Sequence, residues 1–80
     1  MTPQSEEIVL DAVVSVTATP EIRVERDVDL FEAGLIDSLG FVELLVALEA
    51  SLGLSISPTE VDRQDVSTVN KLLAFVGERL

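Results

Sequence analysis

The sequence contains neither cysteine nor histidine, and phenylalanine supplies all three of its aromatic side chains. Disulfide bonds and zinc sites built on thiolates or imidazoles are therefore excluded, so packing alone must hold the fold. The core must consist mainly of Val, Leu, Ile and Ala. Eighty residues are enough for one small domain, residues 1–80, whose folding buries only about 60 % of the surface of the unfolded chain.

Basic residues are scarce. Five Lys and Arg face fifteen Asp and Glu, for a formal net charge of −10. This balance opposes binding to nucleic acid and favours encounters with basic protein surfaces. The first seven residues carry no basic side chain and acids interrupt every long apolar run, so we expect no signal peptide and no membrane span. These features predict a cytoplasmic protein, which we expect to be a monomer.

Apolar residues recur at helical spacing in three long segments. We predict helices over 3–16, 38–52 and from about 67 or 68 to 79. Ser57-Pro58-Thr59-Glu60 reads as a capping box with proline at the first helical position, which predicts a short helix ending near Asp62. The expected fold is all-α, a four-helix bundle with three long helices and a short third one. No repeat or linker divides the chain.

The connection over residues 17–37 is long for a compact domain, unless it is functional or holds structure of its own. Its apolar residues are spaced to anchor it in the core. They are Ile22, Val24, Val28, Leu30, Phe31 and Leu35. Gly34 is expected to supply a backbone geometry that other residues resist. Asp29 and Glu32 suit a short turn, whereas an EF-hand is excluded because its turn glycine and terminal glutamate are both missing.

Asp37 and Ser38 form the candidate site. Asp37 is a good N-cap, which places Ser38 at the first helical position, where free amides and the helix dipole favour a phosphate on its oxygen. The same pair also occurs as an ordinary helix cap in many proteins. The surrounding sequence Gly-Leu-Ile-Asp-Ser-Leu, followed by Val42-Glu43-Leu44 and Ala47-Leu48-Glu49, resembles the acyl carrier protein family in register.

That resemblance implies that Ser38 carries 4′-phosphopantetheine, attached from coenzyme A by a phosphopantetheinyl transferase that Asp37 helps to engage. The cofactor would bring the thiol that the chain lacks. An adenylating ligase would load the thiol with an acyl or aminoacyl thioester, and an acyltransferase or synthase would receive it. The protein itself would catalyse nothing. A docking surface on the second helix would comprise Leu39, Glu43, Val46, Ala47 and Glu49.

The C-terminal third is similar to D-alanyl carrier proteins through the Asp62-Arg63 pair and the Thr68-x-Asn70-Lys71 run. Arg63 is either a further partner-binding residue or a surface ion pair with a neighbouring acid. The excess of Arg over Lys and the abundant Val and Ala hint at a GC-rich source. We therefore favour an aminoacyl carrier in polyketide or nonribosomal antibiotic biosynthesis over D-alanylation of cell-wall teichoic acid.

Two other classes of function remain as alternatives. An enzyme with Ser38 as nucleophile would need a base, but histidine is absent and the single lysine lies in the last predicted helix. The other alternative is an acidic interaction domain or nucleic-acid mimic, in which Ser38 needs no modification.

Overall fold

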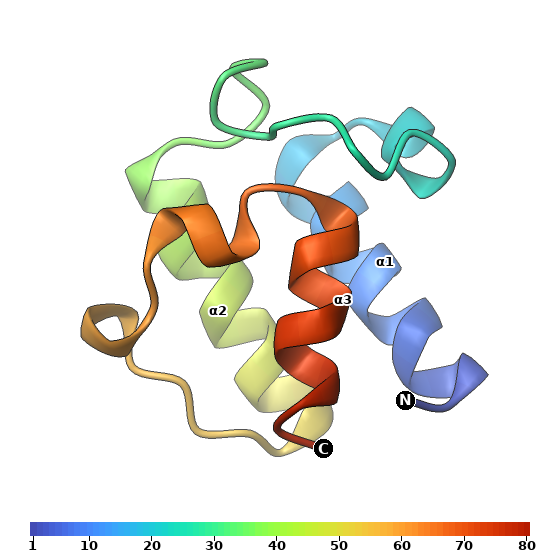
Figure 1. Ribbon diagram of the computed structural model, residues 1–80, viewed down its shortest axis with the longest axis vertical. Coiled ribbons are helices and arrows are strands. Elements are labelled where there is room, and N and C mark those ends of the chain that lie inside the picture. The colour runs from blue at the N-terminus through green and yellow to red at the C-terminus, as the bar shows by residue number, and fades with distance from the viewer.

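The computed structural model describes all residues, Met1–Leu80, and contains three α-helices and no strands. They are α1 (Pro3–Thr17), α2 (Ser38–Leu52) and α3 (Val69–Gly77). The connection between α1 and α2 crosses one end of the molecule, where α1 ends and both α2 and α3 begin (Figure 1). The all-α prediction is confirmed, and the three long helices start and end within about two residues of their predicted bounds.

The helix ends follow the capping residues of the sequence. Thr2 and Thr68 accept hydrogen bonds through Oγ1 from the amides of Ser5 and Lys71, each at 3.1 Å. Gly53 ends α2 in the left-handed conformation, at φ 68°. Ala18 ends α1 in the same conformation, and its amide donates to the Val14 carbonyl at 2.7 Å. Local sequence therefore sets where each long helix begins and ends.

The predicted short third helix is wrong as an α-helix. Its segment forms two 3₁₀ turns, η2 (Pro58–Glu60) and η3 (Arg63–Val66), so the structure has three α-helices where four were expected. The Ser57 hydroxyl bonds the Thr59 hydroxyl at 2.8 Å and caps no amide. Val61 is extended and buried, which stops the helix after one turn. A single turn fixes several residues for very few hydrogen bonds, so it cannot grow against that anchor.

A continuous aliphatic core fills the space between the helices. Its fully buried members are Val9, Val13, Ile22, Leu30, Leu44, Leu45, Leu48, Val66, Val69, Leu72 and Val76. Of the predicted anchors of the long connection, Ile22 and Leu30 are buried, and Phe31 and Leu35 are partly buried against the core. Ile36, which was not predicted, is buried as well. Val24 is a wrong prediction, because its side chain is 83 % exposed.

The long connection holds one 3₁₀ turn, η1 (Pro20–Arg23), and is tied by its backbone to the start of α3. The Leu30 amide donates to the Ser67 carbonyl at 2.8 Å, and the Asn70 amide donates to the Arg26 carbonyl at 3.1 Å. The Asn70 side chain adds a bond to Asp27 Oδ1 at 2.7 Å. Gly34, at φ 72°, makes the predicted left-handed turn before α2.

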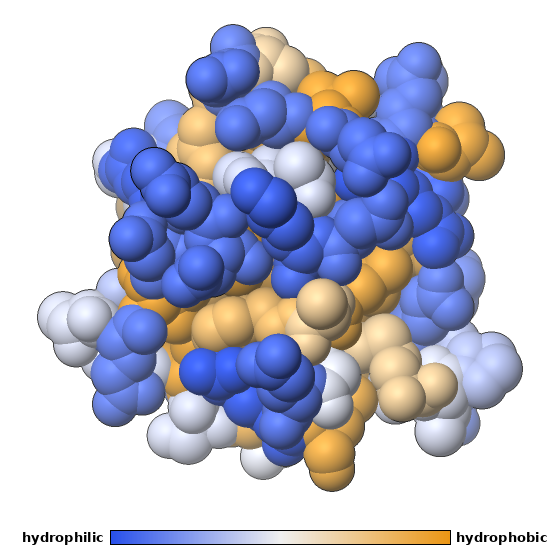
Figure 2. Space-filling model, in the orientation of Figure 1, coloured by the Kyte–Doolittle hydropathy of each residue, from blue (hydrophilic) through white to orange (hydrophobic).

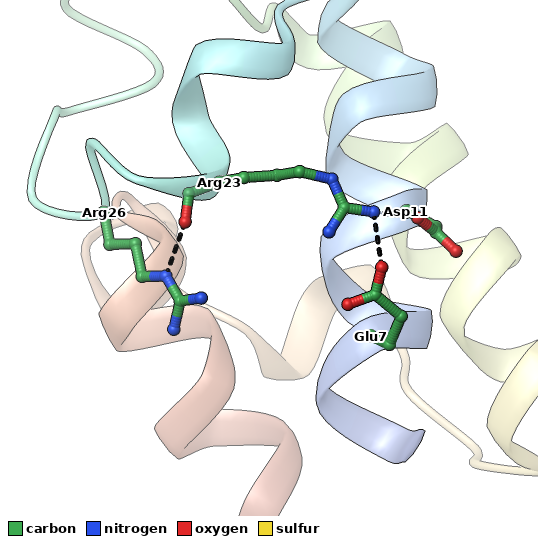
Figure 3. Close-up of polar contacts among 4 residues, drawn as sticks. All are labelled: Glu7, Asp11, Arg23 and Arg26. Atoms are coloured by element: carbon green, nitrogen blue, oxygen red, sulfur yellow. Dashed lines mark hydrogen bonds and ion pairs between the residues drawn. The ribbon is translucent and has the colours of Figure 1, made fainter. Parts of the chain in front are cut away.

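Two of the five basic residues hold the other end of this connection against α1. Figure 3 shows Arg23 reaching Glu7 on α1, and Arg26 donating a hydrogen bond to the Arg23 carbonyl. Arg23 pairs with Glu7 at 2.8 Å and also with Asp11, while Arg26 pairs with Glu6 at 2.7 Å. The hydrogen bond to Glu7 raises the pKa of the Arg23 guanidinium, despite some loss of hydration. These pairs leave Arg63, Lys71 and Arg79 as the bases that form no ion pair.

The surface alternates charged and apolar areas. Figure 2 shows a broad hydrophilic band across this face, with apolar atoms emerging between the charged side chains below it. None of the three helices combines the length and the hydropathy that crossing a bilayer requires.

Candidate functional site

Ser38 is the first residue of α2, and Asp37 caps the helix as predicted. Asp37 Oδ1 accepts a hydrogen bond from the Gly40 amide at 2.7 Å. The amides of Ser38 and Leu39 make no hydrogen bond outside the helix, and the first amides of a helix have no partner within it. The Ser38 hydroxyl is therefore exposed beside free backbone donors at the positive end of the helix dipole.

Gly40 has a packing role that the sequence did not reveal. A Cβ atom at this position would lie 2.9 Å from Ile36 Cγ1, 3.3 Å from Asp37 Oδ1 and 3.4 Å from Val16 Cγ1. Ile36 is buried, so it has little room to withdraw. The absence of a side chain at Gly40 thus lets the first turn of α2 pack closely against Ile36 and the end of α1.

Arg63 lies directly beside Ser38, although 25 residues separate them in the sequence. Its Nη2 donates a hydrogen bond to Ser38 Oγ, and its guanidinium carbon lies 5.2 Å from the centroid of the Phe31 ring. The alternative of a surface ion pair is not borne out, since Arg63 pairs with no carboxylate. Nothing in the spacing of the sequence could have predicted this contact with Ser38.

Two open hollows flank this end of the molecule. One, of about 350 Å³, is lined by Phe31, Arg63, Ser67 and Lys71 among others. The other, of about 280 Å³, is lined on its α2 side by Asp37, Leu39, Gly40 and Glu43. Arg63 therefore links the two places, since it bonds Ser38 and lines the first hollow, which no residue of α2 lines.

The predicted docking residues fall into two groups. Leu39 and Val46 are 68 % and 56 % exposed, and Glu43 is exposed with them. Val42, which was not among the predicted docking residues, is 40 % exposed. It lies one helical turn from Leu39 on one side and from Val46 on the other. Its i+3 and i+4 spacing from Leu39 and Val46 was the signal that could have found it. These four residues form what we call the α2 face.

Ala47 and Glu49 are less accessible than the docking prediction assumed, and both are half-buried. Glu49 Oε2 accepts a hydrogen bond from the Ile56 amide at 2.8 Å, which ties the segment after α2 back onto the helix. Glu49 therefore has a structural task within the domain.

The chemistry available at Ser38 is that of an acceptor of a modification. The only side chain bonded to its oxygen is a guanidinium, which cannot take up a proton, so no base of the chain contacts Ser38 to activate it as a nucleophile. No group of acids is arranged to hold a metal ion. An exposed hydroxyl, a neighbouring cation and free helix amides fit a phosphate ester, and hence the phosphate of 4′-phosphopantetheine.

Comparison with known proteins agrees with this chemistry. A family model described as phosphopantetheine attachment site matches residues 7–76. A D-alanyl carrier protein of Lactococcus lactis subsp. lactis (strain IL1403) is 40 % identical over 92 % of this chain and 94 % of its own length. D-alanyl carrier proteins of Abiotrophia defectiva and Bacillus velezensis (strain DSM 23117 / BGSC 10A6 / LMG 26770 / FZB42) are 37 % and 40 % identical, over 94 % and 88 % of this chain and 95 % and 90 % of their own lengths.

The match begins within α1, includes all of α2, the long connection and the turn that holds Arg63, and ends at Val76 in α3. It covers the whole site, including Asp37, Ser38 and Gly40. The group that such a domain bears is covalent 4′-phosphopantetheine, and the domain is a carrier that catalyses no reaction of its own. The chain belongs to the family of phosphopantetheine-binding carrier proteins.

Proposed function

We propose that Ser38 is the attachment residue and that the holo protein carries an aminoacyl thioester, with D-alanine as the first candidate. The observation that carries the attachment is the position of the Ser38 hydroxyl. It is exposed at the capped start of α2, next to a cation and with no base of the protein in contact. Modification of this hydroxyl therefore needs a separate enzyme that supplies the base.

Attachment is a phosphoryl transfer from coenzyme A. Ser38 Oγ attacks the phosphorus that bears the pantetheine, an Oγ–P bond forms, and the pyrophosphate P–O bond breaks. The hydroxyl proton passes to a base of the transferase, and the adenosine bisphosphate portion leaves. The product presents a thiol at the end of a flexible arm, which raises the effective concentration of the cargo at each partner enzyme in turn.

The choice of cargo rests on the relatives. The relatives compared above are named D-alanyl carrier protein, and they align over nearly the whole chain. They favour D-alanylation over the natural-product pathway that the composition suggested, for which the comparisons offer no support. The partners proposed on this basis are a phosphopantetheinyl transferase, an adenylating ligase that loads D-alanine, and an acyltransferase that receives it.

The α2 face is the proposed docking surface for these enzymes. Leu39, Val42 and Val46 offer exposed apolar area, and the Glu43 carboxylate lies at its edge. A partner groove with apolar walls and basic rims would match it in both respects. Because the chain carries a net charge of −10, association should also slow as salt rises.

The attachment is tested by intact mass after incubation with coenzyme A and a transferase. The wild type should gain the mass of one phosphopantetheine, and Ser38→Ala should gain none while retaining its helicity. Ser51→Ala, which removes an exposed serine near the end of the same helix, is the matched control and should be modified normally. Mass gain in Ser38→Ala would place the attachment elsewhere and refute the assignment.

The cargo is tested by loading the holo protein with an adenylating ligase and a panel of amino and carboxylic acids. D-alanine should give the fastest thioester formation with the ligase of a D-alanylation system. Preference for another amino acid, with D-alanine inert, would return the protein to the natural-product alternative.

Docking is tested with Val46→Asp, which places a charge on the α2 face. This variant should slow delivery to partner enzymes with little loss of fold. Val24→Asp makes the same change at an exposed valine in the long connection and serves as the control. Equal rates for both variants would show that the partner surface lies elsewhere.

A further inference from the structure

We propose that Arg63 is a positioning residue for the phosphodiester of the holo protein, where its guanidinium pairs with the phosphoryl oxygens carried by Ser38. This inference rests on the proposed attachment at Ser38. It assigns Arg63 a role inside the domain, in place of the partner-binding role that the sequence suggested.

The first support is the contact itself. Arg63 Nη2 already bonds Ser38 Oγ, the atom to which the phosphorus becomes attached. The guanidinium is held from below by Phe31, whose ring meets the ring of buried Phe41 edge to face, with 5.8 Å between centroids. Arg63 begins the turn η3, which Asp62 caps through a hydrogen bond from the Gln64 amide at 3.1 Å. Phe31 thus supports the guanidinium, and the Asp62 cap fixes the backbone of the turn that carries it.

The second support is that the charge of Arg63 has no partner in the apo protein. Arg23 and Arg26 each pair with carboxylates of α1, although fifteen acids share the surface with only five bases. Arg63 has a neutral hydroxyl and an aromatic ring as its neighbours instead. Lys71 and Arg79 also form no ion pair, but of these three bases only Arg63 bonds the oxygen to be modified, which suits it to an anion that arrives later.

The chemistry of the product completes the argument. Modification turns the Ser38 hydroxyl into an ester oxygen bonded to phosphorus. The same phosphorus bears two non-bridging oxygens that share one negative charge, so this charge lies next to Ser38 Oγ. A guanidinium offers several N–H donors in one plane and can bond such oxygens in pairs, which an ammonium group cannot. The new charge would otherwise add to a net charge of −10. Pairing with Arg63 offsets that repulsion where it arises.

The direction of the arm follows from the same geometry. Arg63 bonds Ser38 Oγ and also lines the hollow of about 350 Å³, together with Phe31, Ser67, Lys71 and the acids Asp29 and Glu32. A phosphate drawn toward the guanidinium turns the first atoms of the arm to that side. The α2 face, with Leu39 and Val46, stays open to partner enzymes while the arm is attached.

The test compares Arg63→Gln with Arg79→Gln. Both variants remove one cation that stacks on a phenylalanine, because the Arg79 guanidinium carbon lies 3.7 Å from the centroid of Phe75. Each variant and the wild type are converted to the holo form, checked by intact mass, and melted in both forms at low salt. The measured quantity is the change in melting temperature on conversion from apo to holo.

We expect conversion to change the melting temperature equally in the wild type and in Arg79→Gln. In Arg63→Gln the change in melting temperature from apo to holo should be about 2–4 °C less favourable than in the wild type. The deficit should disappear at about 1 M salt, where charges are screened over about 3 Å, and Arg63→Lys should restore only part of it. An apo-to-holo change in melting temperature that is equal in the wild type, Arg63→Gln and Arg79→Gln would overturn the inference.

A measurement on the wild type alone keeps the inference testable if the transferase rejects Arg63→Gln. The side-chain Nε–H resonance of Arg63 should shift on conversion to the holo form, while that of Arg79 should stay in place. An unmoved Arg63 resonance in protein of confirmed holo mass would refute the positioning role and leave the attachment intact. Absence of any mass gain in the wild type would instead refute the proposed function itself.

Discussion

Replacing Gly40 with alanine tests whether close packing at the start of α2 outweighs helix propensity. Alanine favours a helix over glycine by about 0.5–1 kcal/mol, so propensity alone predicts a more stable protein. The structure predicts the reverse, because the added Cβ would lie 2.9 Å from Ile36 Cγ1 and 3.3 Å from Asp37 Oδ1. The first atom belongs to a buried, β-branched side chain, and the second is the capping oxygen of the helix.

Overpacking of this kind costs about 1–3 kcal/mol, which exceeds the gain in propensity. The net loss in the free energy of unfolding should be about 1 kcal/mol, and a domain of this size then melts about 4–8 °C lower. Gly77→Ala is the matched control, because no atom lies within 4 Å of its added Cβ at the end of α3. That variant should be neutral or slightly more stable than the wild type.

Urea unfolding followed by far-ultraviolet circular dichroism measures both variants on one scale. The reasoning requires Gly40→Ala to fall below Gly77→Ala in the free energy of unfolding. If Gly40→Ala equals or exceeds the control, Ile36 moves aside at little cost, and the close approach at this glycine has no energetic weight.

Three further predictions concern the cap, the segment after α2 and the net charge. Asp37→Ala should lower the free energy of unfolding by about 1 kcal/mol in urea, while Asp37→Asn, which keeps an acceptor for the Gly40 amide, should lose less; equal losses would show that the cap acts through charge alone. Glu49→Ala should cost about 1 kcal/mol and speed hydrogen exchange at the Ile56 amide, and unchanged exchange would mean that this bond does not hold the segment. Raising salt or adding millimolar divalent cation should raise the melting temperature, because the net charge is −10 and added ions screen the repulsion. Protection from hydrogen exchange should increase first in the connection before Ser38. A flat or falling melting temperature would show that self-repulsion does not limit the fold.

Local signals made most of the fold predictable. Asp37 and Gly53 mark the ends of α2 in the sequence and do so in the structure, and Thr2 and Thr68 begin the other two helices. The spacing predicted a core row of Phe41, Leu44, Leu45, Leu48 and Leu52 on α2; the first four are buried and Leu52 is half-buried. Each capping residue lies within about one helical turn of the group that it bonds, so the sequence displays that interaction directly.

Features that depend on distant contacts were not predictable. Val61 interrupts the expected short helix because the core takes up its side chain. Glu49 turns inward to the Ile56 amide, and Arg63 reaches Ser38 through the folded chain. Ser38 and Asp37 could be recognised as a pair because they are adjacent. The cation that completes the site is brought there only by the path of the segment after α2.

The backbone bonds between the long connection and the start of α3 bear on how the molecule opens. The Leu30 amide is bonded to the Ser67 carbonyl, and the Asn70 amide to the Arg26 carbonyl, so neither segment can leave without releasing the other. The two should open as a single cooperative unit, with their amides exchanging at matched rates despite their separation along the chain. A partner enzyme that pulls on the segment before Ser38 would then feel the resistance of α3 as well. The long connection and the start of α3 would then move as one rigid unit, and only the phosphopantetheine arm would move freely relative to it.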